Sequence, residues 1–156
     1  MKLFAASLLM LCVTLPPHAP EGEVRCTCRP SPPGGVTQCQ PGQTAVCRGK
    51  GGVCQGSCVS LSAQLEPMRY SAELLKATTG EEVTEAALKK NPKEAKKLLE
   101  RVIELSDRGK SGDIKVMGRK HYVGIGLSEV AKGKLKAAIK ALVVPVHVTI
   151  PPIFRP

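Results

Sequence analysis

The sequence predicts an α+β protein in two parts: a short, loop-rich module stapled by disulfide bonds, followed by a small two-layer domain of helices and strands. Six cysteines fall within residues 26–58, in a stretch rich in proline and glycine. From residue 60 onward there is no cysteine, and alanine, leucine, lysine and glutamate dominate. In this second part the apolar residues recur first with the period of a helix and then with that of a strand. The predicted division is therefore a leader over 1–22, a cysteine-rich module over 23–59 and a domain over 60–156.

The first 22 residues have the pattern of a secretory signal peptide. Met1 and Lys2 precede an apolar run from Leu3 to Leu15, and prolines follow the run. This run is shorter than the ~20 residues with which a helix spans a bilayer, and a basic start with a polar end is typical of an export signal. We therefore expect a secreted, periplasmic or cell-envelope protein. The alternative is a lipoprotein anchored through Cys12, which lies inside the run.

The cysteine-rich module has few large apolar side chains with which to fold. Four prolines and seven glycines lie between Arg29 and Gly56. An even number of cysteines after a signal peptide is typical of a disulfide framework, in which each bond contributes about 3 kcal/mol. The alternative is a structural zinc site, but only Cys54-x3-Cys58 has the spacing of a zinc knuckle. We expect disulfides, with their connectivity open, among Cys26, Cys28, Cys39, Cys47, Cys54 and Cys58.

Helix signals follow in chain order. A short helix is expected over 71–77. Thr79 and Glu82 have the spacing of a capping box for a second helix that extends to about Lys90. Asn91-Pro92-Lys93-Glu94 is the start signal of a third helix, which Gly109 ends. One face of this third helix is apolar and consists of Ala95, Leu98, Leu99, Val102 and Leu105.

Beyond Gly109 the apolar residues recur at every second position, as in a β-strand. Alternation over 114–117 and 122–127 predicts a β-hairpin with a turn near Gly118. Ser128 begins another helix, and residues 144–150 alternate again, so a last strand is expected there. The helix between the second and third strands is long enough for a crossover that pairs these two strands in parallel. We therefore expect these elements to form a small sheet with helices packed on one face.

This element order, from Pro92 to Ile150, resembles the α-β-β-α-β layout of the BON modules of bacterial envelope proteins. The resemblance rests on element order alone. It implies a module that is associated with membrane surfaces.

The charge distribution indicates a partner. The formal net charge is +10, and residues 108–140 hold nine lysines and arginines against two acids. A one-sided excess favours an anionic partner such as a lipid surface or an acidic polysaccharide. The alternative is an ordinary solvated lysine face. The candidate binding residues are Arg119, Lys120, Lys132, Lys136 and Lys140.

We find no catalytic or cofactor motif beside these charges. His121 and His147 have no nucleophile motif near them. Gly124-Ile125-Gly126 lacks the third glycine of a dinucleotide fingerprint, because Glu129 stands in its place. We therefore expect no enzyme activity, no cofactor and no metal. Export and the scarcity of aromatic side chains for base stacking argue against nucleic acid as a partner.

The sequence thus predicts an exported, non-enzymatic binding module for an anionic partner at the cell envelope or outside the cell. The alternative is a secreted effector, such as a protease inhibitor or an antimicrobial-type cysteine-rich module. In that alternative residues 24–58 are the active part, with Arg48-Gly49-Lys50 as a presented loop.

The intact mass of the exported protein, before and after thiol alkylation, checks the disulfide framework. If the six cysteines are paired, the native protein takes up no alkylating label and the reduced protein takes up six. Six reactive thiols in the native protein, or a metal bound in stoichiometric amount, would contradict both the framework and the oxidising compartment that it implies.

Overall fold

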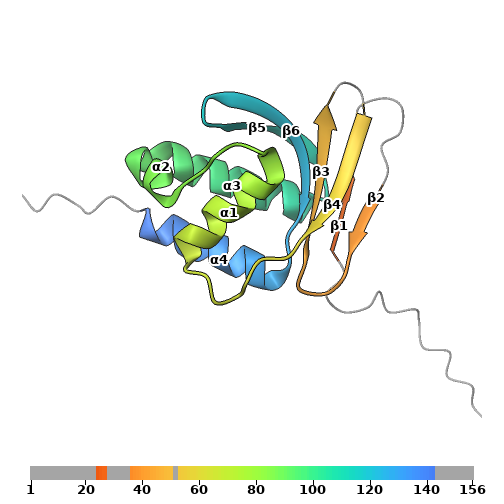
Figure 1. Ribbon diagram of the computed structural model, residues 1–156, viewed down its shortest axis with the longest axis horizontal. Helices are drawn as coiled ribbons and strands as arrows, with labels where there is room; N and C mark the ends of the chain where they lie inside the picture. Colours follow the sequence, from red (N-terminus) through yellow and green to blue (C-terminus); the bar gives the residue numbers. More distant parts are fainter. Residues whose placement is uncertain (1–23, 28–35, 51–52, 143–156) are drawn as a thin grey trace, which may run out of the picture.

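The computed structural model describes residues 24–27, 36–50 and 53–142. Its helices and antiparallel sheets confirm the α+β class. Figure 1 shows three layers: a pair of strands, a larger sheet and a group of helices on the far side of that sheet. The features that lie outside the described residues are the predicted signal peptide, Cys12, Cys28, the side chain of Cys54, and the predicted last strand with His147.

The larger sheet joins the two compositionally different parts of the chain. Its strand order is β4-β3-β6-β5, and all neighbouring strands are antiparallel. The cysteine-rich module supplies two of these strands, and β3 pairs with β6 from Ala45↔Gly126 to Gly49↔Tyr122. A strand of the cysteine-rich module therefore lies inside the sheet of the second part. The strands are β3 (Thr44–Lys50), β4 (Val53–Val59), β5 (Ser111–Val116) and β6 (Arg119–Gly126).

The parallel partner predicted for β6 is wrong. β6 has β3 along one edge and β5 along the other, and both pairings are antiparallel. The sequence did not reveal this because β3 lacks the alternation of a half-buried strand. Its residues Thr44 to Cys47 are all at most 1% exposed, since layers cover both faces of the strand.

A two-stranded layer covers the sheet face that the helices leave free (Figure 1). β1 (Val24–Thr27) and β2 (Val36–Cys39) pair with each other in an antiparallel arrangement. The disulfide Cys26–Cys47 joins β1 to β3, and Cys39–Cys58 joins β2 to β4, with Cα atoms 6.2 and 5.6 Å apart. The structure thus confirms disulfide bonding in the cysteine-rich module, and it indicates an oxidising compartment.

Two glycines of β6 allow the two strand layers to approach closely. A Cβ atom on Gly126 would lie 2.5 Å from the carbonyl oxygen of Arg25, and one on Gly124 would lie 2.7 Å from that of Thr27. Real Cβ atoms essentially never come this close to a backbone atom. The two glycines at alternate positions of β6 therefore have a packing role, which explains a spacing that resembled half of a nucleotide-binding motif.

The helical layer lies on the other face of the sheet, which α1 and α3 contact directly, whereas α2 and α4 pack against these two helices (Figure 1). The helices bury an aliphatic core that includes Leu74, Leu99 and Leu135, each at most 1% exposed, against Val123 and Ile125 of β6. The helices are α1 (Pro67–Thr79), α2 (Glu85–Lys90), α3 (Pro92–Arg108) and α4 (Glu129–Ala141).

Both ends of α3 and the start of α4 match the sequence signals, whereas α1 begins at Pro67, four residues before the predicted start. Pro92 is the first residue of α3, Gly109 ends it in the left-handed conformation, and the Ser128 side chain accepts a hydrogen bond from the Ala131 amide. The capping box predicted at Thr79 is wrong. Thr79 is the last residue of α1, where its hydroxyl accepts from the Glu81 amide at 3.2 Å, and Thr84 caps α2 instead.

Replacing Gly126 by alanine tests the close contact between the strand layers. The new methyl group meets the Arg25 carbonyl, so we expect a loss of at least about 2 kcal/mol in the free energy of unfolding, or no folding at all. The control is Gly133→Ala in α4, where a Cβ meets nothing within 4 Å. We expect it to stabilise the protein by up to about 1 kcal/mol. Urea unfolding of the oxidised proteins measures both, and equal effects would contradict the packing described here.

Candidate functional site

The five predicted binding residues lie on two separate surfaces. Arg119 and Lys120 begin β6, at the β5–β6 turn, whereas Lys132, Lys136 and Lys140 lie along α4. Figure 1 shows the β5–β6 turn at the top of the molecule and α4 at the bottom. The structure therefore brings the three α4 lysines together but keeps the two β6 residues apart from them.

Two of the five have carboxylate partners within the protein. Lys132 Nζ lies 2.6 Å from Asp107 Oδ1 at the end of α3, and this hydrogen bond raises the pKa of Lys132 above its ordinary value. Arg119 Nη1 lies 3.5 Å from Glu81 Oε1. These two side chains serve as contacts between elements. Lys136 and Lys140 are exposed.

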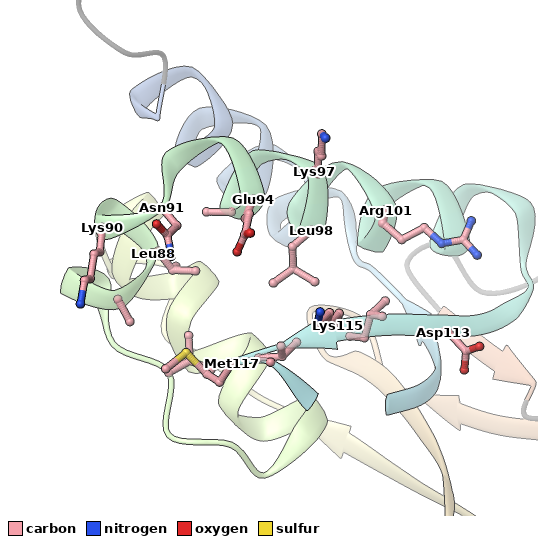
Figure 2. Close-up of a pocket in the computed structure, with 16 residues that line it drawn as sticks. Leu88, Lys90, Asn91, Glu94, Lys97, Leu98, Arg101, Asp113, Lys115 and Met117 are labelled. Carbon is pink, nitrogen blue, oxygen red and sulfur yellow. The ribbon is translucent and has the colours of Figure 1, made fainter. Parts of the chain in front are cut away.

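The α4 lysines adjoin a second group of lysines that the sequence analysis missed. Residues 89–97 contain five lysines and one acid, across the end of α2 and the start of α3. Lys132, Lys136 and Lys140 are four residues apart and therefore lie along one side of α4. This side faces α3, because Lys132 contacts Asp107 at the end of α3. Figures 1 and 2 both show the C-terminal end of α4 beside the first half of α3. We call this region the basic end: Lys89, Lys90, Lys93, Lys96, Lys97, Lys136 and Lys140.

Helix stability explains only part of the basic end: Lys89, Lys90 and Lys140 lie in last turns, where the helix dipole favours a cation, but the lysines at the start of α3 do not. Within residues 89–100, only Glu94 and Glu100 carry negative charge, and only Lys96 has an ion-pair partner found here, Glu100 at 3.9 Å. Lysines near a helix N-terminus oppose the helix dipole, each at a cost of a few tenths of a kcal/mol. The start of α3 therefore concentrates positive potential at a small expense in stability. A charge count over a short window along the whole chain would have found this segment.

A groove lies next to the basic end, between α2 and α3 on one side and β5 on the other (Figure 2). Its volume is about 840 Å³. Ala87, Leu98 and Met117 contribute apolar surface, whereas Leu88 and Val116 are at most 5% exposed. Charged side chains such as Lys90 and Lys115 stand around them. No sequence signal could have found this groove, because it forms only when three elements distant in the chain come together.

The described histidine has a structural contact. His121 Nε2 lies 3.3 Å from Glu81 Oε1, and both side chains are 19% exposed. Since Glu81 also contacts Arg119, it fastens the α1–α2 connection to the start of β6. Within the described residues, no group of three or more His, Cys, Asp or Glu side chains is placed to hold a metal ion. Among the same residues, no helix has the length and apolar character needed to span a membrane.

Replacing Lys132 by methionine separates the structural lysine of α4 from the exposed ones. We expect a loss of about 0.5 kcal/mol in the free energy of unfolding at low salt, which shrinks as salt screens the pair with Asp107. Lys136→Met is the matched control on the same helix and should change stability little. Urea unfolding at two salt concentrations measures both. Equal losses in the free energy of unfolding for the two variants would show that the contact with Asp107 does not stabilise the protein.

No family model matches the chain, and no curated protein or solved structure shows a significant similarity to it. The function of this protein is therefore argued from its own residues and their arrangement.

Proposed function

We propose that the protein is an exported, non-enzymatic binding module whose basic end binds an acidic polysaccharide outside the cytosol. The observation that supports this most strongly is the gathering of seven lysines from α2, α3 and α4 at one end of the helical layer, with Glu94 and Glu100 as the only acids of residues 89–100. Such a field attracts polyanions and speeds their association.

The scaffold fits a binding role in an oxidising compartment. Two disulfides fix the strand layers to each other. The buried face of α3, which includes Val102, packs on the main sheet, and α4 packs against α1 and α3. Lysines carried by such helices keep their spacing. A rigid array of charges binds a repeating polymer at a lower entropic cost than flexible side chains on a loop.

An acidic polysaccharide is favoured over a lipid surface by the lack of apolar anchors. The exposed large apolar residues among those described are Val36, Met117 and Val130. They lie in β2, in the β5–β6 turn and in the first turn of α4, so none belongs to the basic end. Helices that lie in a membrane interface combine basic residues with a large apolar face.

The alternative of a protease inhibitor gains no support from the presented loop. Arg48 and Gly49 are inner residues of β3, and each pairs with β4 on one side and with β6 on the other. A main chain held on both sides is not accessible to a protease in the way that an inhibitory loop must be.

A charge-reversal experiment tests the basic end. The triple variant Lys93→Glu, Lys96→Glu, Lys140→Glu should bind heparin at least about tenfold more weakly than the natural protein, because three favourable charges become unfavourable. The control reverses Arg69, Lys110 and Lys120, which are exposed cations outside the basic end, and should lose about threefold or less. Binding is measured by calorimetry over a range of salt concentrations.

Three results would overturn the proposal. Equal losses in the two triple variants would mean that net charge, and not the basic end, determines binding. Binding that does not weaken with salt would exclude exposed charge contacts. Binding to anionic lipid vesicles without binding to heparin would replace the polysaccharide by a membrane surface.

A further inference from the structure

The groove beside the basic end runs along the free edge of β5. Its lining includes Ile114 and Val116, which face the helices, and also Asp113 and Lys115, which face the opposite way. Residues of both faces line one groove only where that groove follows the edge of the strand. Figure 2 shows β5 passing below α3, with Asp113, Lys115 and Met117 spaced along it.

The free edge presents backbone groups that suit another strand. Among the described residues, β6 is the one strand that pairs with β5, and the turn that joins them is Met117-Gly118, both with positive φ. In a hairpin with a two-residue turn, the pair next to the turn, here Val116 and Arg119, is joined by two backbone hydrogen bonds. Along the two strands, hydrogen-bonded pairs then alternate with pairs that are not hydrogen-bonded, so Lys115 and Asp113 belong to the second kind. The amide and carbonyl groups of Asp113 and Lys115 are therefore directed outward, into the groove.

The side chains around the groove alternate in the same way as those of a strand. Toward the helices its accessible apolar side chains are Ala87 and Leu98, whereas Lys115 stands on the other face of β5. Cations slightly outnumber acids around it: Lys90, Arg101 and Lys115 lie beside Glu94 and Asp113, whereas the Lys97 side chain points away from β5 (Figure 2). A strand laid along β5 would place every second side chain under α3 and the others near Lys115.

We propose that this groove binds an extended segment of another protein in which acidic and apolar residues alternate, and that the segment adds to the sheet as a strand beside β5. Charge complementarity favours an acidic partner, because the groove is cationic and the whole chain carries +10. The same charge disfavours a second copy of this chain, which would bring another cationic groove to the same edge. The volume of about 840 Å³ lies within the range of sites that enclose a ligand.

The groove shares Lys90 and Lys97 with the basic end, but its partner is recognised differently. Strand addition gains affinity from main-chain hydrogen bonds and specificity from alternate side chains. A polysaccharide held by exposed lysines needs neither. The two proposals therefore stand or fall separately.

The test uses the oxidised full chain and a labelled peptide of about six residues in which glutamate and valine alternate, a length that matches β5. Fluorescence anisotropy measures its binding. One control peptide has the same composition with the glutamates and valines in two blocks, and the other has lysine in place of glutamate. We expect the alternating acidic peptide to bind at least about tenfold more tightly than either control, because only it satisfies both faces of the added strand.

Two variants at one position separate charge from strand addition. Lys115→Gln removes only the cation and should weaken binding by about threefold. Lys115→Pro also removes the outward amide, without breaking a bond to β6, and should weaken binding by about tenfold or more. The triple variant Lys93→Glu, Lys96→Glu, Lys140→Glu tests the other proposal and should bind the peptide within about threefold of the natural protein, since none of the three lines the groove.

Hydrogen exchange on the natural protein supplies a readout that does not depend on a proline variant folding. Binding of the alternating peptide should protect the amides of Asp113 and Lys115 from exchange. The proposal is overturned if the alternating and block peptides bind equally, if no peptide binds, or if the two amides gain no protection on binding. It is also overturned if these amides are already protected in the free protein, because the edge would then be covered by the chain itself or by a second copy.

Discussion

The structure depends on a close approach between two layers of strands, which small side chains allow and two disulfides hold. β1 lies over β6 where Gly124 and Gly126 remove the side chains that would keep the layers apart. On β3 the residues paired with these glycines are Cys47 and Ala45, and Cys47 is bonded to Cys26 of β1. Backbone therefore packs against backbone, and any larger residue at either of these two positions would push the two-stranded layer away.

The position of β3 follows from this contact. The strand has the two-stranded layer on one face and the helices on the other, so that residues Thr44 to Cys47 are buried regardless of polarity. The cysteine-rich part thus contributes the inner strand of the sheet on which the helices rest. The β5 edge, at the opposite end of the strand order from β4, has no strand partner in the described part of the chain, and the basic end lies next to it.

Local signals in the sequence predicted the second part of the chain well. Ser128, Pro92 and Gly109 mark helix ends through their own backbone chemistry, and alternation marked the β5–β6 hairpin. The β-strands of the cysteine-rich part could not be predicted, since Ala45, Cys47 and their neighbours are buried by partners distant in sequence. Thr79 has the residue type of a helix start, yet its hydroxyl accepts a hydrogen bond just beyond the end of α1. The same limit applies to the site: the lysines of 89–97 are visible as a charge run, but their approach to α4 and the groove along β5 depend on tertiary contacts.

The disulfide connectivity tests the central contact most directly. The oxidised protein is cleaved, without reduction, by proteases that cut between Cys28 and Cys39, between Cys39 and Cys47 and between Cys47 and Cys58, and the linked cysteines are assigned by fragmentation in the mass spectrometer. The close packing of the layers predicts links from Cys26 to Cys47 and from Cys39 to Cys58, each of which joins the two-stranded layer to the main sheet. A link between Cys26 and Cys39 would instead join β1 to β2 within the two-stranded layer. These cysteines would then not attach the layer to β3 and β4, and the arrangement on which the rest of the fold depends would be contradicted.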